Sequence, residues 1–143
     1  WVRGSQLNLP SALSTSVNGA LILLTLGLAW RAARARDLVR HRRHALRAFL
    51  LVNGVWFLRL GIASAAMGLA AAGQRLELDG ALFLAIGIGS WAIPLAALEL
   101  YFLAERARSD ALRWATAALV LVLAVITAAA GAAAWVGMWA PRL

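Results

Sequence analysis

His41, His44 and Arg47 are the residues of this sequence most able to bind a ligand, because two imidazoles and a guanidinium recur there within two helical turns. Their spacing of i, i+3 and i+6 places them along one slowly drifting side of a helix. One interpretation is a cofactor site for haem or a quinone, or a site for an anion. The other is a solvated basic cap on a membrane helix. Two histidines one turn apart on one helix do not grip both faces of one haem, so the cofactor stays unknown.

The sequence predicts neither a metal centre nor a catalytic residue. It has two histidines and no cysteine, which is too few ligands for a closed metal site. A glycine-rich phosphate loop, a His-Glu-x-x-His motif and a Gly-x-Ser-x-Gly motif are all absent. We therefore expect a protein that is not an enzyme.

A run of arginines surrounds the two histidines and is typical of a segment that contacts anionic lipid head groups. The arginines we assign to head-group binding are Arg34, Arg36, Arg40, Arg42 and Arg43. Basic proteins also bind nucleic acid, but here the arginines lie at the ends of apolar segments and form no basic soluble face. We therefore expect lipid, and no nucleic acid, as the partner of these side chains.

Three further polar residues lie inside the apolar segments: Asn53, Arg59 and Glu99. Charges at membrane depth are costly and mark functional sites. By helical rise, Glu99 lies at the level of Arg47 or His44, and we expect it to pair with one of them. Asn53 lies between Arg47 and Arg59 and is expected to join them through water. Such a polar track would suit a proton path, a quinone head group or a haem propionate.

The elements that must position these residues are four transmembrane helices. The chain is 63% hydrophobic and 14% charged, far more apolar than a soluble domain. The predicted spans, each close to or longer than the roughly 20 residues that cross a bilayer, cover residues 11–30, 45–72, 80–104 and 112–139. The predicted fold class is all-α, an integral membrane four-helix bundle that forms a single domain over residues 1–143.

Several residues predict where these helices begin, end and bend. Asp37 is predicted to cap the helix that carries the histidines, and Gly73 to end it. Asp79 is expected to cap the third span, and Ser109 or Asp110 the fourth. Pro94 should kink the third span and free the carbonyl of Ser90.

Charge asymmetry predicts the orientation. All 14 basic residues are arginine. Ten of them flank the two loops on one side, and three lie on the other: Arg3, Arg75 and Arg142. The positive-inside rule then places both termini on the periplasmic or outer side of a bacterial inner membrane. Because the chain starts at Trp1 on that side, we expect upstream helices to be missing.

Small residues predict how the helices pack. Gly61, Ala65, Gly68 and Ala72 form one stripe on the second span, and Ala124, Ala128 and Gly131 form another on the fourth. Such stripes let helix backbones approach closely in a membrane.

The segment from Ala32 to Arg47 resembles a bacterial multi-span membrane family, the domain of unknown function 2306. That family shows a basic loop, a His-Arg-x-x-Met-x-Arg pattern and a later Leu-Arg pair, matched here by His41, Arg42, Arg47 and Leu58-Arg59. A family Trp-x-x-Pro followed by glutamate is similar to Trp91, Pro94 and Glu99, while the methionine is missing. The resemblance covers about residues 20–106. It implies a polytopic helical protein without an established activity, and one connected site of His41, Arg47, Arg59 and Glu99.

Three functions stay open at this point. The first is a non-catalytic accessory or structural subunit that packs with other membrane subunits in a larger complex. The second is a redox module that binds haem or quinone at His41, His44 and Arg47. The third is a transporter or proton-relay protein that uses Arg59 and Glu99.

Overall fold

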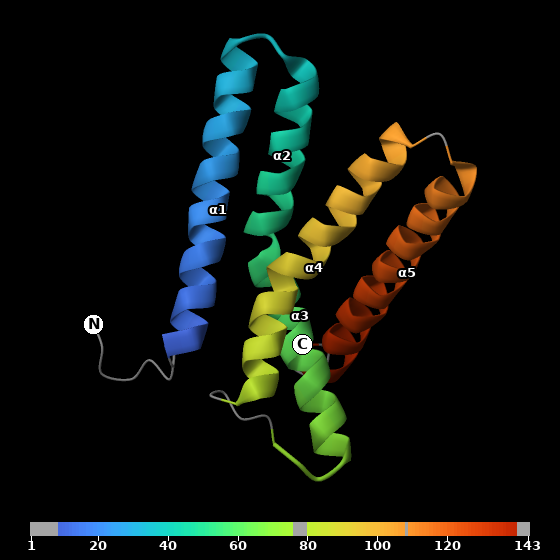
Figure 1. Cartoon of the computed structure of the whole chain (residues 1–143). Helices are drawn as coiled ribbons and strands as arrows, with labels where there is room; N and C mark the ends of the chain where they lie inside the picture. The colour runs from blue at the N-terminus through green and yellow to red at the C-terminus, as the bar shows by residue number, and fades with distance from the viewer. Residues whose placement is uncertain (1–8, 76–79, 108, 140–143) are drawn as a thin grey trace.

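A computed structural model describes residues 9–75, 80–107 and 109–139, and within them every element is helical (Figure 1). The α-helices are α1 (Leu9–Arg34), α2 (Leu38–Val52), α3 (Gly54–Ala71), α4 (Ala81–Arg106) and α5 (Asp110–Ala134). A short π-helix, η1 (Trp135–Trp139), continues α5.

Four of these helical segments are long and apolar enough to cross a membrane, and α2 and α3 together make the second of them. The four segments are Leu9–Arg34, Leu38–Ala71, Ala81–Arg106 and Asp110–Gly137. The prediction of an all-α, four-span membrane protein is therefore confirmed. The first helix continues four residues beyond its predicted end at Trp30, because Arg31 and Arg34 extend it past the apolar stretch.

The α1–α2 connection is a tight turn built on Arg36 and Asp37. The backbone N–H of Asp37 donates to the carbonyl of Ala32, and that of Arg36 to Ala33, which together close the C-terminus of α1. Arg36 adopts a left-handed conformation, with φ of 56°, where glycine is the usual residue. The Asp37 carboxylate then accepts a hydrogen bond from the backbone N–H of Arg40 (3.0 Å) and caps α2, as predicted.

The second span is interrupted at Asn53, whereas its apolar sequence predicts one continuous helix. Asn53 has ψ of −5°, well away from the helical value of about −42°. Its side-chain amide donates back to the carbonyl of Phe49 (2.8 Å), one turn earlier on its own helix. The side chain therefore competes with the helical backbone for hydrogen bonds, which is how asparagine disturbs helix interiors.

The break divides the packing of the second span between two sets of neighbours. Helix α2 packs against α1 and α4, whereas α3 packs against α4 and α5. Figure 1 shows α2 running beside α1, and α3 passing behind α4. Helix α5 contacts neither α1 nor α2 within the described residues. The α1–α2 and α4–α5 connections lie at the same end of the molecule, which we call the arginine end.

The remaining helix ends agree with the sequence in most respects. Gly73, with φ of 71°, ends α3, where the backbone N–H of Gln74 donates to Leu69 and that of Gly73 to Ala70. Ser109 caps α5 by accepting from the backbone N–H of Leu112 (3.4 Å). Helix α4 has Gly80 as its N-cap, and Asp79 lies outside the described residues. Pro94 lies inside α4, and Figure 1 shows that this helix bends.

The small-residue stripes are only partly used for packing. Gly61 lies against α4, so close that a Cβ atom there would be 2.6 Å from Cγ2 of Ile86. Gly68 and Gly131 belong to the predicted stripes, but a Cβ atom at either would have no neighbour within 4 Å among the described residues. The prediction of close approach is thus confirmed at Gly61, whereas within the described residues no neighbouring helix lies against Gly68 or Gly131.

Candidate functional site

Arg47 and Glu99 form the shortest ion pair among the described residues and join α2 to α4. Nε of Arg47 lies 2.5 Å from Oε1 of Glu99, and Nη2 lies 2.8 Å from Oε2. Two parallel N–H···O bonds of this kind combine charge attraction with a fixed geometry. The Arg47 side chain is 24% exposed and that of Glu99 is 44% exposed, so the pair is partly shielded. The predicted contact between Glu99 and the end of the second span is confirmed.

The same two helices carry a wider set of charges around this pair. Glu105 of α4 lies 3.5 Å from both Arg42 and Arg43 of α2. The ring of Phe102 is buried between the two carboxylates and lies under both Arg43 and Arg47, with 5.4 and 5.1 Å from guanidinium carbon to ring centroid. Cations over an aromatic face are attracted by its quadrupole. We call this set the α2–α4 charge cluster: Arg42, Arg43, Arg47, Glu99, Phe102 and Glu105.

His41 belongs to a different interface from Arg47. The carbonyl oxygen of Ala29 on α1 accepts a hydrogen bond from Nδ1 of His41 (3.0 Å), which places the ring proton on that nitrogen. His41 thus faces α1, while Arg47 faces α4. His44 lies between them, and its buried Nδ1 has no hydrogen-bond partner among the described residues. The structure does not gather the three side chains around one point.

The remaining arginines of the predicted head-group set differ in their surroundings. Arg34 and Arg36 are exposed at the arginine end. Arg40 lies 3.3 Å from Asp37 and is also largely exposed. Within the described residues no group of three or more histidine, cysteine or acidic side chains is placed to hold a metal ion. A cofactor at His41 and His44 therefore stays a prediction.

A second polar interface lies deeper in the bundle, between α1 and its neighbours. The side-chain amide of Asn18 donates to the carbonyl of Leu51 at 3.5 Å, just before the break in the second span. Nε1 of Trp91 on α4 donates to the hydroxyl of Ser14 (3.3 Å). Gly54 allows this approach, because a Cβ atom there would be 3.2 Å from Cβ of Trp91. Sequence reasoning did not assign Ser14 or Asn18 a role, although their i, i+4 spacing on an apolar span was the available signal.

Arg59 stands apart from all these contacts. It is exposed on α3 and has no hydrogen bond or ion pair with any described residue. It lies twelve residues from Arg47 and twelve from Ala71, or about 18 Å from each along the helix. Arg59 therefore lies well inside the second segment that is long and apolar enough to cross a membrane, Leu38–Ala71. Neither Glu99 nor Asn53 reaches it, so the structure does not form the connected site that the family resemblance implies.

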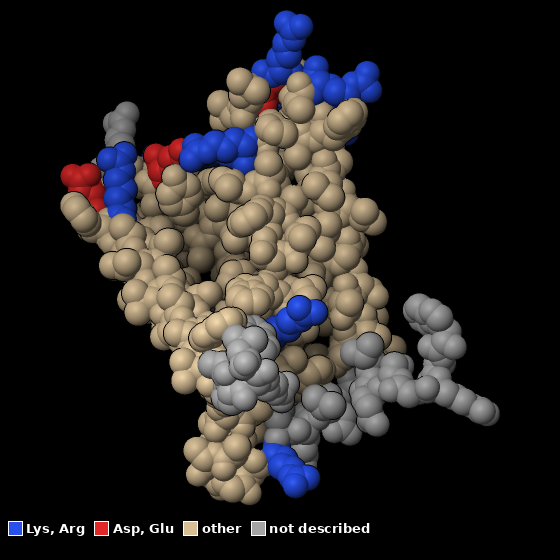
Figure 2. Space-filling model, turned by 180° about the vertical axis from the view of Figure 1, so that it is seen from behind, with Lys and Arg blue, Asp and Glu red and all other residues tan. Residues whose placement is uncertain are grey.

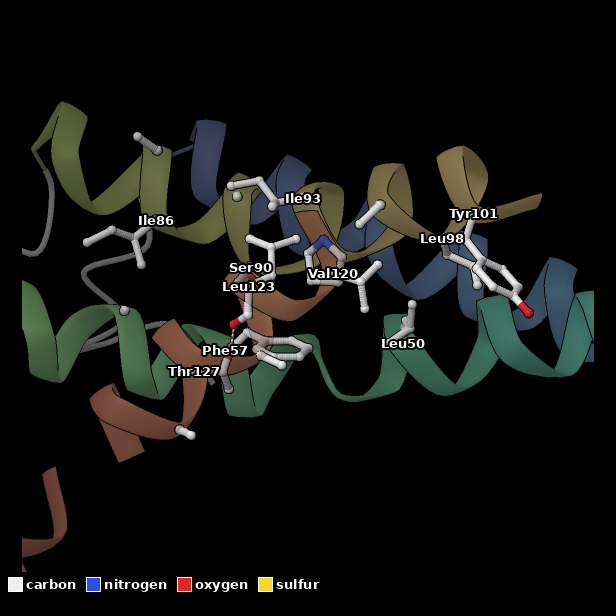
Figure 3. Close-up of a pocket in the computed structure, with 17 residues that line it drawn as sticks. Leu50, Phe57, Ile86, Ser90, Ile93, Leu98, Tyr101, Val120, Leu123 and Thr127 are labelled. Carbon is white, nitrogen blue, oxygen red and sulfur yellow. Dashed lines mark hydrogen bonds between the residues drawn. The ribbon is translucent and has the colours of Figure 1, made fainter. Parts of the chain in front are cut away.

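A long apolar groove runs between α3, α4 and α5 and has a volume of about 980 Å³ (Figures 2 and 3). On α4 it follows one face from Ala85 to Tyr101. Ser90 and Thr127 line it too, but their hydroxyls donate to the carbonyls of Gly87 and Leu123 on their own helices. The Tyr101 hydroxyl makes no hydrogen bond with a described residue, so it is the free polar group of the lining.

Comparison with protein-family models found no match to this chain, and neither did comparisons with curated proteins and with solved structures. The resemblance to the domain of unknown function 2306 family therefore stays a prediction. The site rests on the residues and geometry described above.

Proposed function

We propose that this chain is a non-catalytic subunit that packs within a larger membrane protein complex. The observation that carries the proposal is Arg59, which is exposed inside the second membrane-length segment and makes no ion pair with a described residue. An arginine at the centre of a helix in lipid costs about 2.5–3.5 kcal/mol on insertion scales. A polar or acidic group of a neighbouring subunit would remove much of that cost.

The described part of the chain offers Arg59 no carboxylate of its own. Glu99 is bound to Arg47, and Glu105 to Arg42 and Arg43. The two other described acidic residues, Asp37 and Asp110, pair with arginines on their own helices at the arginine end. None of the four described carboxylates is therefore left to pair with Arg59, and in this proposal its counter-charge comes from another subunit.

The surroundings of Arg59 also favour a protein neighbour. The face of α3 that carries it is otherwise apolar and leaves Val55 and Trp56 exposed. Towards the C-terminal end of α3, the same face carries the small residues Ala66 and Ala70, which are also exposed. Small residues beside a polar one are the usual composition of helix–helix contacts in membranes.

In this proposal the arginine end faces the cytoplasm of a bacterial cell, where the exposed Arg34 and Arg36 contact anionic lipids. The positive-inside rule and the concentration of arginines at this end support that orientation.

The test is the size of the protein extracted gently from its native membrane. We expect the wild-type chain in an assembly larger than its 15.2 kDa monomer. Arg59→Leu should insert at least as well, because it removes the charge, and yet release free monomer. Arg75→Leu is the matched control, since it removes an exposed arginine near the end of the same span and should leave the assembly intact. A wild-type chain that runs as a lone monomer in native polar-lipid discs would refute the proposal.

A further inference from the structure

We propose that the groove between α3, α4 and α5 binds a polyprenyl phosphate, with its isoprenoid chain along α4 and its phosphate at the arginine end. This site is separate from the outward face of α3 that carries Arg59. Three features of the groove carry the proposal: its length, its chemistry and the charges at one of its ends.

The length of the groove points to a chain longer than an ordinary acyl tail. The groove follows α4 from Ala85 to Tyr101, which are sixteen positions apart, or about 24 Å along the helix. Half of the hydrocarbon core is only about 15 Å thick, and a phospholipid tail ends near that depth. Figure 3 shows Ile86 and Tyr101 at opposite ends of the groove. A single chain that fills it must therefore cross the midplane.

The walls of the groove leave room for a single apolar chain. Small residues, among them Gly89, Ala97 and Ala124, keep the groove open between α4 and α5. The close contact of Gly61 with Ile86 closes α3 against α4 at the end away from the arginines. The hydroxyls of Ser90 and Thr127 already donate to carbonyls of their own helices, so these two side chains need no water inside the groove.

The chemistry changes at the arginine end, where the groove meets hydrogen-bond donors. The free hydroxyl of Tyr101 lies there, one helical turn from Glu105. Glu105 holds Arg42 and Arg43 at 3.5 Å, longer than the 2.7–2.9 Å of a close charge-assisted bond. The Arg42 side chain is 60% exposed and keeps free N–H donors. Figure 2 shows acidic and basic side chains gathered at this end of the hollow.

Charge at this end favours an anionic head group over a neutral one. Four described arginines, Arg42, Arg43, Arg106 and Arg113, accompany two carboxylates, Glu105 and Asp110. Guanidinium groups bind phosphate through paired N–H donors and charge attraction, whereas a neutral quinone carbonyl accepts hydrogen bonds without the charge attraction. In this proposal the phosphate is bound by Tyr101, which lines the groove, and by Arg42, which shares Glu105 with Arg43 one helical turn further along α4.

The experiment is native mass spectrometry of the full chain released from phosphatidylcholine nanodiscs that contain undecaprenyl phosphate as the probe. We expect one bound molecule on the wild-type protein. Ala124→Phe fills the groove from α5 and should lower the bound fraction about tenfold. Ala129→Phe adds the same ring to an exposed position of α5 outside the groove, and it should leave binding unchanged. Equal losses in both variants, or no bound probe on wild type, would overturn the proposal.

Further probes and variants test the head group. Undecaprenol, ubiquinone and phosphatidylglycerol should each bind about tenfold more weakly than undecaprenyl phosphate. Tyr101→Phe and Arg42→Gln should lower phosphate binding, whereas Arg31→Gln, an exposed arginine on α1, should not. Phosphatidylglycerol that binds as well as the probe, and is insensitive to Ala124→Phe, would identify ordinary surrounding lipid and refute the site. Binding of undecaprenol equal to that of the phosphate would refute the role of the arginines.

Discussion

Arg47 and Glu99 show how a charge near the end of a membrane span is made useful by a partner on another helix. Their two short hydrogen bonds satisfy both oxygens of the carboxylate, and the buried ring of Phe102 supports the guanidinium from one side. Because the pair is only partly exposed, water screens it less than a surface pair. The contact therefore fixes α2 on α4 at one defined position.

We predict that Arg47→Gln and Glu99→Gln each lower the free energy of unfolding by about 1–2 kcal/mol. The double variant should lose less than the sum, since each single change leaves a charged partner without its counter-ion. Reversible unfolding in mixed micelles, followed by circular dichroism, measures this.

Arg113→Gln is the control for that measurement. Arg113 lies 3.6 Å from Asp110 on its own helix, and both side chains are more than half exposed, so its loss should cost at most about 0.5 kcal/mol. Equal costs at Arg47 and Arg113 would show that the α2–α4 pair adds no stability.

At the scale of residues, the sequence predicted contacts that depend on position along a helix axis. It did not predict contacts that depend on the angle at which one helix faces another. The pairing of Glu99 with Arg47 followed from counting residues from the arginine-rich loop. The hydrogen bond of His41 with Ala29 needs the angular position of α2 on α1, which residue counting does not supply. The left-handed conformation of Arg36 could not be predicted either, because the turn contains no glycine to indicate it.

At the scale of elements, the helix crossing of α3 and α4 depends on one glycine. A Cβ atom at Gly61 would meet the Ile86 side chain at 2.6 Å, so the helices must shift to accept it. Gly68, two turns further along the same predicted stripe, faces open space. Two substitutions of identical chemistry should therefore have opposite effects.

We predict that Gly61→Ala lowers the free energy of unfolding by about 1–3 kcal/mol through overpacking. Gly68→Ala should instead raise it by up to about 1 kcal/mol, because alanine is the better helix former. The two variants are compared in the same micelle unfolding assay. A destabilisation by Gly68→Ala as large as that by Gly61→Ala would mean that another surface packs on Gly68.

The four spans themselves were predictable from hydrophobic length, whereas the break inside the second was not. Asn53 and Gly54 are only two residues within a strongly apolar run, so they hardly lower the mean hydropathy of the span. The break depends on a local interaction, the hydrogen bond that the Asn53 side-chain amide donates to the carbonyl of Phe49. The apolar groove could not be predicted from the sequence either, because it depends on how α5 is placed against α3 and α4.

At the scale of the whole molecule, both arginine-rich connections lie at one end, which makes orientation directly testable. The chain has no cysteine, so a single introduced thiol reports its own side of the membrane. We predict that Ala35→Cys in intact cells resists a membrane-impermeant maleimide, while Gln74→Cys reacts with it. Both thiols should react after the cells are opened. The reverse pattern would contradict the proposed orientation.

The break at Asn53 has one more consequence, for the rotational phase of the second span. In an uninterrupted helix of 3.6 residues per turn, the twelve residues between Arg47 and Arg59 would hold these side chains about a third of a turn apart. The interruption releases that constraint, so α2 keeps Arg47 on Glu99 while α3 turns to suit its own neighbours. Substitutions in α3 can then change the direction in which Arg59 points, and so the protein it contacts, without disturbing the Arg47–Glu99 ion pair between α2 and α4.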